Sequence, residues 1–196
     1  EAMRVSNPGC YSTGFIALIA PLVAAGLVPA DAALLCHAVS GYSGGGKALI
    51  QRFEEEETDI AWRGYALGLG HKHVPEMMAH CALSVPPMFT PAVVPAFRGM
   101  AVEVPIHRAM QPGFGDADAM REALAAIYAG SPVVRVIDAP GSGELLLRQS
   151  SAPQDGLDLL VTASADGSQI RLIALLDNGW PVLGIIDQPI LRERWI

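Results

Sequence analysis

The stretch NPGCYSTG, residues 7–14, delivers one cysteine to the start of a largely apolar segment, FIALIAPLV, residues 15–23. Its proline and glycine favour a turn, and Ser12 and Thr13 are of the types that cap helix N-termini. A thiol beside the unsatisfied N–H groups of a helix start lies in a positive field, which lowers its pKa below the free value of about 8.5. Cys10 is therefore a candidate nucleophile. The alternative is a small buried cysteine that fills space in a tight turn.

A second motif, HKHVPE at residues 71–76, sets two imidazoles and a carboxylate close together. Histidine titrates near neutral pH and is the general acid or base that a thiolate needs. In an extended segment, side chains two residues apart point to one face, so we expect His71 and His73 to lie side by side. A metal site with Glu76 as third ligand is the alternative. No further cysteine or histidine cluster completes a coordination shell, so we predict no metal site.

A third motif, SGYSGGGK at residues 40–47, follows an apolar run and precedes a predicted short helix over residues 48–53. Consecutive glycines let backbone N–H groups approach a ligand closely, and a helix start behind them favours anions such as phosphate. The spacing does not match the Walker-type phosphate loop, which needs more widely spaced glycines and a Lys-Ser or Lys-Thr ending. A flexible connector is the alternative reading of this loop.

In this order and at this spacing, the three motifs resemble those of the N-acetyl-gamma-glutamyl-phosphate reductase family in its shorter subtype. These are NADPH-dependent enzymes of arginine biosynthesis. The family carries Asn-Pro-Gly-Cys-Tyr, then Ser-Gly-x-Ser-Gly-x-Gly-Lys/Arg, then His-x-His-x-Pro-Glu, and all three occur here. The resemblance covers about residues 5–178. Ser12 is a departure, because many members have proline there.

The resemblance implies a role for particular residues of this chain. Cys10 corresponds to the nucleophile and His71 to the catalytic acid/base. The remaining positions fall into two groups, with Asn7, Tyr65 and His73 binding substrate, and Ser43, Gly44, Gly45 and Asn178 binding the cofactor, NADP(H).

The implied reaction begins with attack of the Cys10 thiolate on an acyl phosphate, which expels inorganic phosphate and leaves a thioester. Hydride transfer from NADPH then yields a thiohemiacetal, which His71 protonates before the semialdehyde departs. Two other classes of function remain open. One is a cofactor-independent hydrolase that uses Cys10 and His71, and the other is a non-catalytic dimerising domain.

Composition narrows the class of protein further. The 196 residues are 51% hydrophobic and carry a net charge of −7. No uninterrupted apolar run reaches the roughly 18 residues that a membrane span needs, and scattered basic residues argue against nucleic-acid binding. Three cysteines without metal-ligand spacing and no secretory signal predict a reducing, cytoplasmic setting. We expect Cys36 and Cys81 to be packing residues.

The pattern of elements predicts an α+β fold. Strand-like runs outnumber helices without strict alternation, which favours a mixed or antiparallel sheet. The expected strands are residues 32–40, 82–86, 101–107, 133–138, 157–164 and 169–176, and the clearest helices are 13–25 and 116–129. The resemblance implies the C-terminal catalytic half of a glyceraldehyde-3-phosphate-dehydrogenase-like fold, whose sheet also forms a subunit interface in a homodimer or tetramer.

The ends of the chain differ from the family pattern. In the family a nucleotide-binding Rossmann half precedes the cysteine motif, so we expect residues 1–178 to be the catalytic and dimerisation domain and the chain alone to be an inactive portion. Residues 179–196 resemble instead a strand hairpin of inositol-monophosphatase-like phosphatases, including those acting on histidinol phosphate. We therefore expect this tail to be foreign to the reductase.

Overall fold

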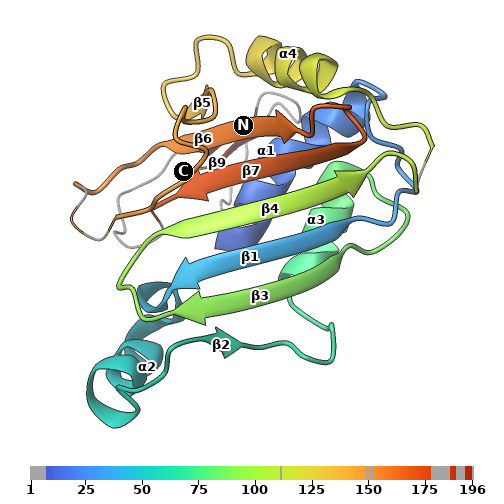
Figure 1. The fold of residues 1–196 in the computed structure, drawn as a ribbon. Coiled ribbons are helices and arrows are strands. Elements are labelled where there is room, and N and C mark those ends of the chain that lie inside the picture. The colour runs from blue at the N-terminus through green and yellow to red at the C-terminus, as the bar shows by residue number, and fades with distance from the viewer. Residues whose placement is uncertain are drawn as a thin grey trace.

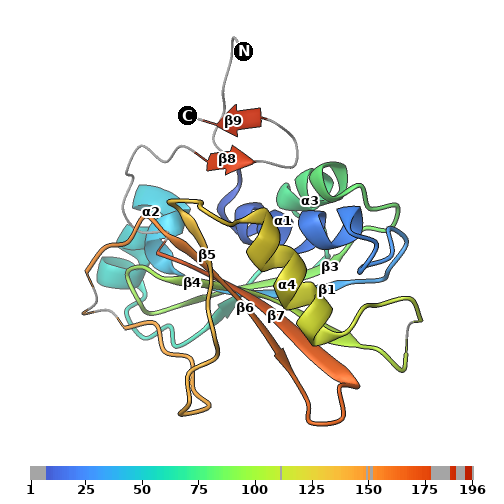
Figure 2. The same cartoon turned by 90° about the horizontal axis from the view of Figure 1, so that it is seen from above.

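The computed structural model describes residues 8–110, 112–148, 150, 152–177, 186–188 and 193–195. A twisted seven-stranded sheet forms its centre, and the helices α1, α3 and α4 cover one face (Figures 1 and 2). The opposite face carries no helix among the described residues (Figure 2). The predicted α+β class with a mixed sheet is confirmed.

The sheet has the order β2-β3-β1-β4-β7-β6-β5. Strand β1 pairs in parallel with β3 and antiparallel with β4, and β5 pairs in parallel with β6. The other pairs, β2 with β3, β4 with β7 and β6 with β7, are antiparallel. The bounds are β1 (Leu35–Gly41), β2 (Arg63–Gly64), β3 (Met88–Val94), β4 (Met100–His107), β5 (Val134–Val136), β6 (Leu157–Ala163) and β7 (Gln169–Leu176).

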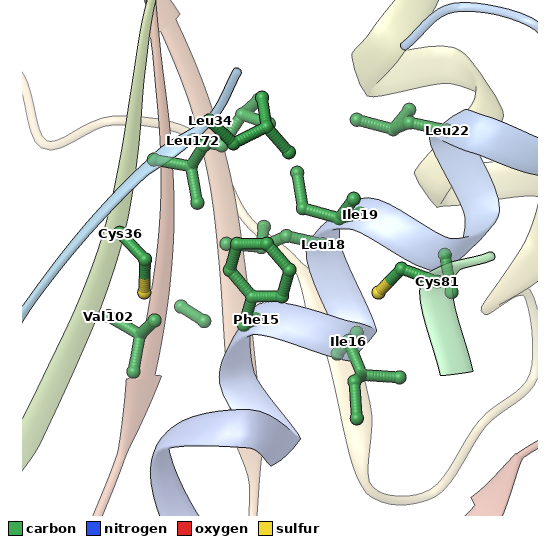
Figure 3. Close-up of a cluster of buried hydrophobic side chains, with 14 of the residues drawn as sticks. Phe15, Ile16, Leu18, Ile19, Leu22, Leu34, Cys36, Cys81, Val102 and Leu172 are labelled. Atoms are coloured by element: carbon green, nitrogen blue, oxygen red, sulfur yellow. The ribbon is translucent and has the colours of Figure 1, made fainter. Parts of the chain in front are cut away.

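Helix α1 (Cys10–Ala24) is the centre of the core, and every residue from Tyr11 to Leu22 is buried. Its apolar side chains meet those of the sheet, and Figure 3 shows Phe15 and Leu18 beside Val102 and Leu172. Because α1 also packs against α3 and α4, it is enclosed by protein on several sides. An all-round apolar sequence suits such a position.

The remaining helices are shorter. Helix α3 (His73–Cys81) and helix α4 (Ala117–Ile127) flank α1, and Asp116 caps α4 by accepting a hydrogen bond from the Ala119 N–H over 2.8 Å. After β1 come a 3₁₀ turn, η1 (Tyr42–Gly45), helix α2 (Gly46–Gln51) and a π-helical turn, η2 (Arg52–Glu56).

Cys36 and Cys81 both lie in the core, as predicted (Figure 3). Burial raises the pKa of both thiols, that of Cys81 to about 12. Neither is a thiolate near neutral pH, and both act as small apolar groups.

Three sequence expectations were wrong. The expected strand at residues 82–86 is a turn, because Ala82 ends α3 in the left-handed conformation, with φ of 52°. The expected extended segment around His73 is the start of α3. Helix α1 begins at Cys10 rather than at residue 13, since Gly9, in extended conformation, is its N-cap. Strand β3 was not predicted, because Pro91 cannot donate to a strand ladder.

The tail contributes two short strands, β8 (Ile186–Gln188) and β9 (Glu193–Trp195), which pair antiparallel with each other. The other tail residues lie outside the described part of the chain.

Gly14 allows α1 to approach the sheet closely. A Cβ at this position would lie 3.0 Å from Val102 Cγ2 and 3.3 Å from Ala174 Cβ. We expect Gly14→Val to lower the free energy of unfolding by about 1–3 kcal/mol through overpacking, measured by urea denaturation. Ala24→Val, at the exposed end of the same helix, is the control and should cost less than about 1 kcal/mol. Equal stability of Gly14→Val and wild type would contradict the close packing.

Candidate active site

Cys10 is the first residue of α1 and is half-buried. Gly9 precedes it in extended conformation, with φ of −65° and ψ of 137°, and caps the helix without a side chain. The first N–H groups of a helix have no partner within the helix and carry its positive field. The thiol therefore sits where a thiolate is stabilised, as the sequence predicts for Cys10.

The first turn of α1 is closed by its own hydroxyls. The Gly9 carbonyl accepts hydrogen bonds from Ser12 Oγ (2.9 Å), Thr13 Oγ1 (3.0 Å) and the Thr13 N–H (2.9 Å). The sequence indicated that Ser12 and Thr13 are N-cap residues. In the structure they belong instead to the first turn of α1. They fix the peptide that precedes Cys10.

Glu76 ties this turn to α3. The Gly9 N–H donates to both carboxylate oxygens of Glu76, over 3.1 and 3.3 Å, and the Ser12 hydroxyl shares its single proton between Oε2 and the Gly9 carbonyl. A carboxylate at a helix N-terminus is favoured by the helix field. The carboxylate considered as a third metal ligand is thus engaged with α1, and no group of three or more His, Cys, Asp or Glu among the described residues is placed to hold a metal ion.

The two imidazoles lie together, with ring centroids 4.6 Å apart and planes inclined by 74°. The reason is not the extended segment that was expected. His71 stands in the turn before α3, His73 begins the helix, and the His73 N–H donates to His71 Nδ1 over 3.2 Å. When Nδ1 accepts, the neutral ring carries its proton on Nε2. Burial, followed by the charge of Lys72, lowers the pKa of His71 below its ordinary value.

His73 lies directly against Gly9. A Cβ on Gly9 would fall 2.3 Å from both Cδ2 and Nε2 of the imidazole, so only glycine fits. The ring is 6% exposed, and its Nδ1 is buried without a hydrogen-bond partner among the described residues. Burial first, and then the neighbouring His71, lower the pKa of His73 to about 4, against the opposing effect of Glu76. His73 is therefore neutral near pH 7.

Aromatic rings complete the cluster around His71. Phe89 of β3 lies edge-on at 5.1 Å between centroids, and Tyr65 at 5.7 Å. Tyr11 contacts His73 at 5.8 Å and shares a side-chain hydrogen bond with Tyr65. Burial raises the pKa of both tyrosines, and the nearby Cys10 adds to each shift. The rings of Tyr65, His71 and His73 therefore form one cluster, and Cys10 lies near its tyrosines, Tyr11 and Tyr65.

The glycine-rich motif lies at the carboxyl end of β1, where it forms η1 and the start of α2. Gly44 and Gly45 are exposed and Ser43 is half-buried. Ser40, three residues before Ser43, also interacts with the Tyr11 hydroxyl, which links this end of β1 to the residue after Cys10. Asn7 and Asn178, the other predicted site residues, lie outside the described residues.

Sequence reasoning missed two members of the cluster, Tyr11 and Phe89. Tyr11 belongs to the cysteine motif, but its direction follows from the helix starting at Cys10. Phe89 alternates with other apolar residues in β3, a signal that Pro91 obscures.

Residues 10–178 match the profile of a family described as semialdehyde dehydrogenase, dimerisation domain. The chain belongs to this family. Its fold is also that of aspartate semialdehyde dehydrogenase structures. The Vibrio cholerae enzyme II matches with a TM-score of 0.59 and 17% identity over 88% of this chain and 56% of that one. A probable enzyme from Pseudomonas aeruginosa matches with a TM-score of 0.60 and 17% identity, over 88% and 57%.

Curated relatives agree with the motif resemblance. The chain is 41% identical to an N-acetyl-gamma-glutamyl-phosphate reductase of Brucella ovis, over 91% of this chain and 59% of the relative. It is 41% identical to reductase 2 of Pseudomonas putida, over 91% and 58%. The chain therefore spans about three fifths of the length of these relatives. The family match ends at residue 178, and the comparisons do not support the expected phosphatase likeness of residues 179–196. Among the described residues, no helix has the length and apolar character needed to cross a membrane.

The buried, neutral His73 makes stability pH-dependent. The folded state keeps the ring neutral down to about pH 4, whereas the unfolded chain protonates it below about 6.5. The unfolded state thus binds more protons in that window, so stability is full above pH 6.5 and is lost as the pH falls from 6.5 to 4. We expect this residue to account for a loss of about 3 kcal/mol, measured by urea denaturation across that range.

His73→Gln should flatten the profile. The matched control is His107→Gln, which removes an exposed histidine of β4. If the control flattened the profile equally, His73 would not be the source of the pH dependence.

Proposed function

We propose that this chain supplies the nucleophile and the acid/base of an NADPH-dependent reductase that converts N-acetyl-gamma-glutamyl phosphate to the semialdehyde and releases phosphate. The observation that carries the proposal is the placement of Cys10, half-buried at the start of α1, near Tyr65, whose ring contacts a His71 ring with Nδ1 already occupied. The relatives of the same name, 41% identical, support the substrate class.

The Cys10 thiolate attacks the acyl carbon, and phosphate leaves with the electron pair of the broken C–O bond, giving a thioester. Covalent capture divides one difficult step into two easier ones. Bound NADPH supplies the hydride that reduces the thioester carbonyl. His71 offers its Nε2 proton to the developing alkoxide, because its Nδ1 already accepts from the His73 N–H. His71 takes the proton back as the C–S bond breaks, which releases the semialdehyde and restores the Cys10 thiolate.

His73 and Tyr65 line the substrate side of this cluster. Neutral His73 and protonated Tyr65 offer hydrogen bonds without adding charge, since burial keeps the pKa of His73 low and that of Tyr65 high. Asn7 is proposed as a third substrate-binding residue on the strength of the motif alone. Two cations lie beside this cluster. Lys72 lowers both imidazole pKa values, and the Arg63 guanidinium lies over the Tyr65 ring, 4.6 Å from its centroid.

The glycine-rich loop suits a cofactor. Gly44 and Gly45 expose backbone without side chains at the carboxyl end of β1, so a ligand can approach the peptide groups directly. Ser43, Gly44 and Gly45 are therefore the residues that would hold NADPH on this chain, with Asn178 proposed from the family motif.

The activity test separates reductase from hydrolase. In the full-length protein that the gene encodes, we expect oxidation of the semialdehyde to require both NADP⁺ and inorganic phosphate, followed by absorbance at 340 nm. Cys10→Ser should abolish turnover, and His71→Asn should lower kcat about 10²- to 10⁴-fold through loss of the acid/base. Rapid release of phosphate from the acyl phosphate without NADPH, together with no oxidation of the semialdehyde, would contradict the reductase proposal and favour a hydrolase.

Thiol reactivity tests the nucleophile independently of the cofactor. At pH 7 iodoacetamide should modify Cys10 well before Cys36 and Cys81, because burial raises the pKa of the latter two. Equal labelling of all three would favour the non-catalytic alternative.

We also propose that the helix-free face of the sheet pairs with a second copy of this chain, because the matched family is described as a dimerisation domain. This face presents Val39 of β1 next to Ala101 of β4, and Ala101 next to Leu175 of β7. Two ion pairs lie on this face. Glu103 and Arg171 form a bidentate pair over 3.0 and 2.6 Å, and Arg135 pairs with Asp158, which is next to Leu175 in the register of β6 and β7. A largely apolar face with few charges is typical of stable homodimer interfaces.

Val39→Glu should convert the dimer to a monomer, measured by sedimentation equilibrium, because it places an unpaired charge at the centre of that face. Ala79→Glu adds the same charge to the exposed side of α3 and is the control. A Val39→Glu protein that stays dimeric would place the interface elsewhere.

A further inference from the structure

Asp177, directly after β7, joins three segments of the chain. Its Oδ2 accepts hydrogen bonds from Arg98 Nη1 and from the Gln154 N–H, the latter over 3.0 Å. Its backbone carbonyl accepts from the Gly99 N–H over 2.6 Å. The Arg98 and Asp177 side chains are only 15% and 12% exposed. This ion pair is the least exposed one that the described residues form, since each of the others has at least one side chain more than a third exposed.

The loop that Asp177 holds, residues 95–99 between β3 and β4, in turn holds the glycine-rich motif. The backbone N–H groups of residues 41, 42 and 43 donate to carbonyls of residues 99, 96 and 97, over 2.8, 2.9 and 2.9 Å. The Tyr42 ring packs edge-on against Phe97, with centroids 5.7 Å apart. Three consecutive hydrogen bonds fix the direction in which the chain leaves β1 and enters η1.

The contact between the two loops leaves no free space. A Cβ at Gly41 would lie 2.6 Å from the Ala96 carbonyl oxygen and 2.7 Å from the Arg98 backbone nitrogen. These atoms are backbone, which yields less easily than the end of a side chain. Any displacement of Arg98 therefore shifts Gly41, and with it the residues that follow.

We propose that Arg98 and Asp177 are positioning residues that hold Ser43, Gly44 and Gly45 in place for the cofactor, an inference that rests on the function proposed above. The described hydrogen bonds of the pair lead through residues 95–99 to the glycine-rich motif. Its loss should therefore weaken cofactor binding while leaving the nucleophile as reactive as before. Loss of a purely structural ion pair would lower the stability of the protein, without weakening cofactor binding selectively.

The test uses Arg98→Gln and Asp177→Asn in the full-length protein that the gene encodes. We expect the KM for NADPH, and the dissociation constant of NADPH measured by its fluorescence, to rise about 10- to 100-fold, the size of effect that a displacement of about 1 Å produces. The KM for the acyl phosphate and the rate of Cys10 alkylation should not change. Arg98→Lys, which keeps the charge that pairs with Asp177, should retain most of the affinity for NADPH.

Arg135→Gln is the matched control. It removes the same charge and breaks an ion pair with Asp158 that joins β5 to β6, beside the same Gln154. It should leave the NADPH dissociation constant unchanged. An equal effect of Arg135→Gln, or a loss of affinity in Arg98→Lys as large as in Arg98→Gln, would overturn the proposal.

The outcomes also separate this proposal from the function on which it rests. If wild-type protein binds NADPH and the Arg98→Gln and Asp177→Asn variants bind it equally well, only the positioning role is wrong. If wild-type protein neither binds NADPH nor reduces the acyl phosphate, both the role and the proposed function are wrong.

Discussion

The burial of α1 against the sheet governs the rest of this domain. The helix is apolar on all sides and lies between the sheet, α3 and α4, so its side chains supply much of the core. Cys10 is its first residue. Interiors are packed at the density of organic crystals, and a helix enclosed in this way has little freedom to slide or rotate. The candidate nucleophile is consequently positioned by the core, although it stands at the end of an irregular segment. Gly14 contributes by letting the helix come close to β4 and β7.

The electrostatics of the cluster follow from the same burial. Both imidazoles have a lowered pKa, His73 more than His71, so neither carries a stable positive charge near pH 7. The start of α1 therefore contributes a positive field at Cys10, and neither imidazole adds a full positive charge near pH 7. This leaves His71 neutral, with a proton on Nε2 to donate. Glu76 opposes the lowered pKa of His73 only in part, and its carboxylate accepts hydrogen bonds from Gly9 and Ser12.

The two faces of the sheet have separate tasks. The face under the helices holds the core and one wall of the site, through Phe89 of β3. The other face carries the Glu103–Arg171 pair among apolar residues and is open to a partner. At the carboxyl end of β1 the chain leaves the sheet and forms the glycine-rich turn. The loop of residues 95–99 accepts hydrogen bonds from that turn, and Asp177 accepts hydrogen bonds from the loop. The cysteine cluster and the proposed cofactor loop are thus held by different contacts, which meet at Tyr11 and Ser40.

Local patterns in the sequence were sufficient to predict several of the strands and one of the helices. Strand β7 was predicted with its bounds, β4 and β6 within one residue, and α4 within two residues, because alternation and helical periodicity depend on neighbours in sequence. The three motifs also predict Cys10 and His71 as partners, which stays a prediction. The start of α1, the fold of residues 71–81 and the existence of β3 depended on contacts between distant segments. Glu76 reaches Gly9 across 67 positions, and Arg98 reaches Asp177 across 79. Such pairings have no local signature, because the hydrogen bonds that decide them form only when the chain has folded around α1.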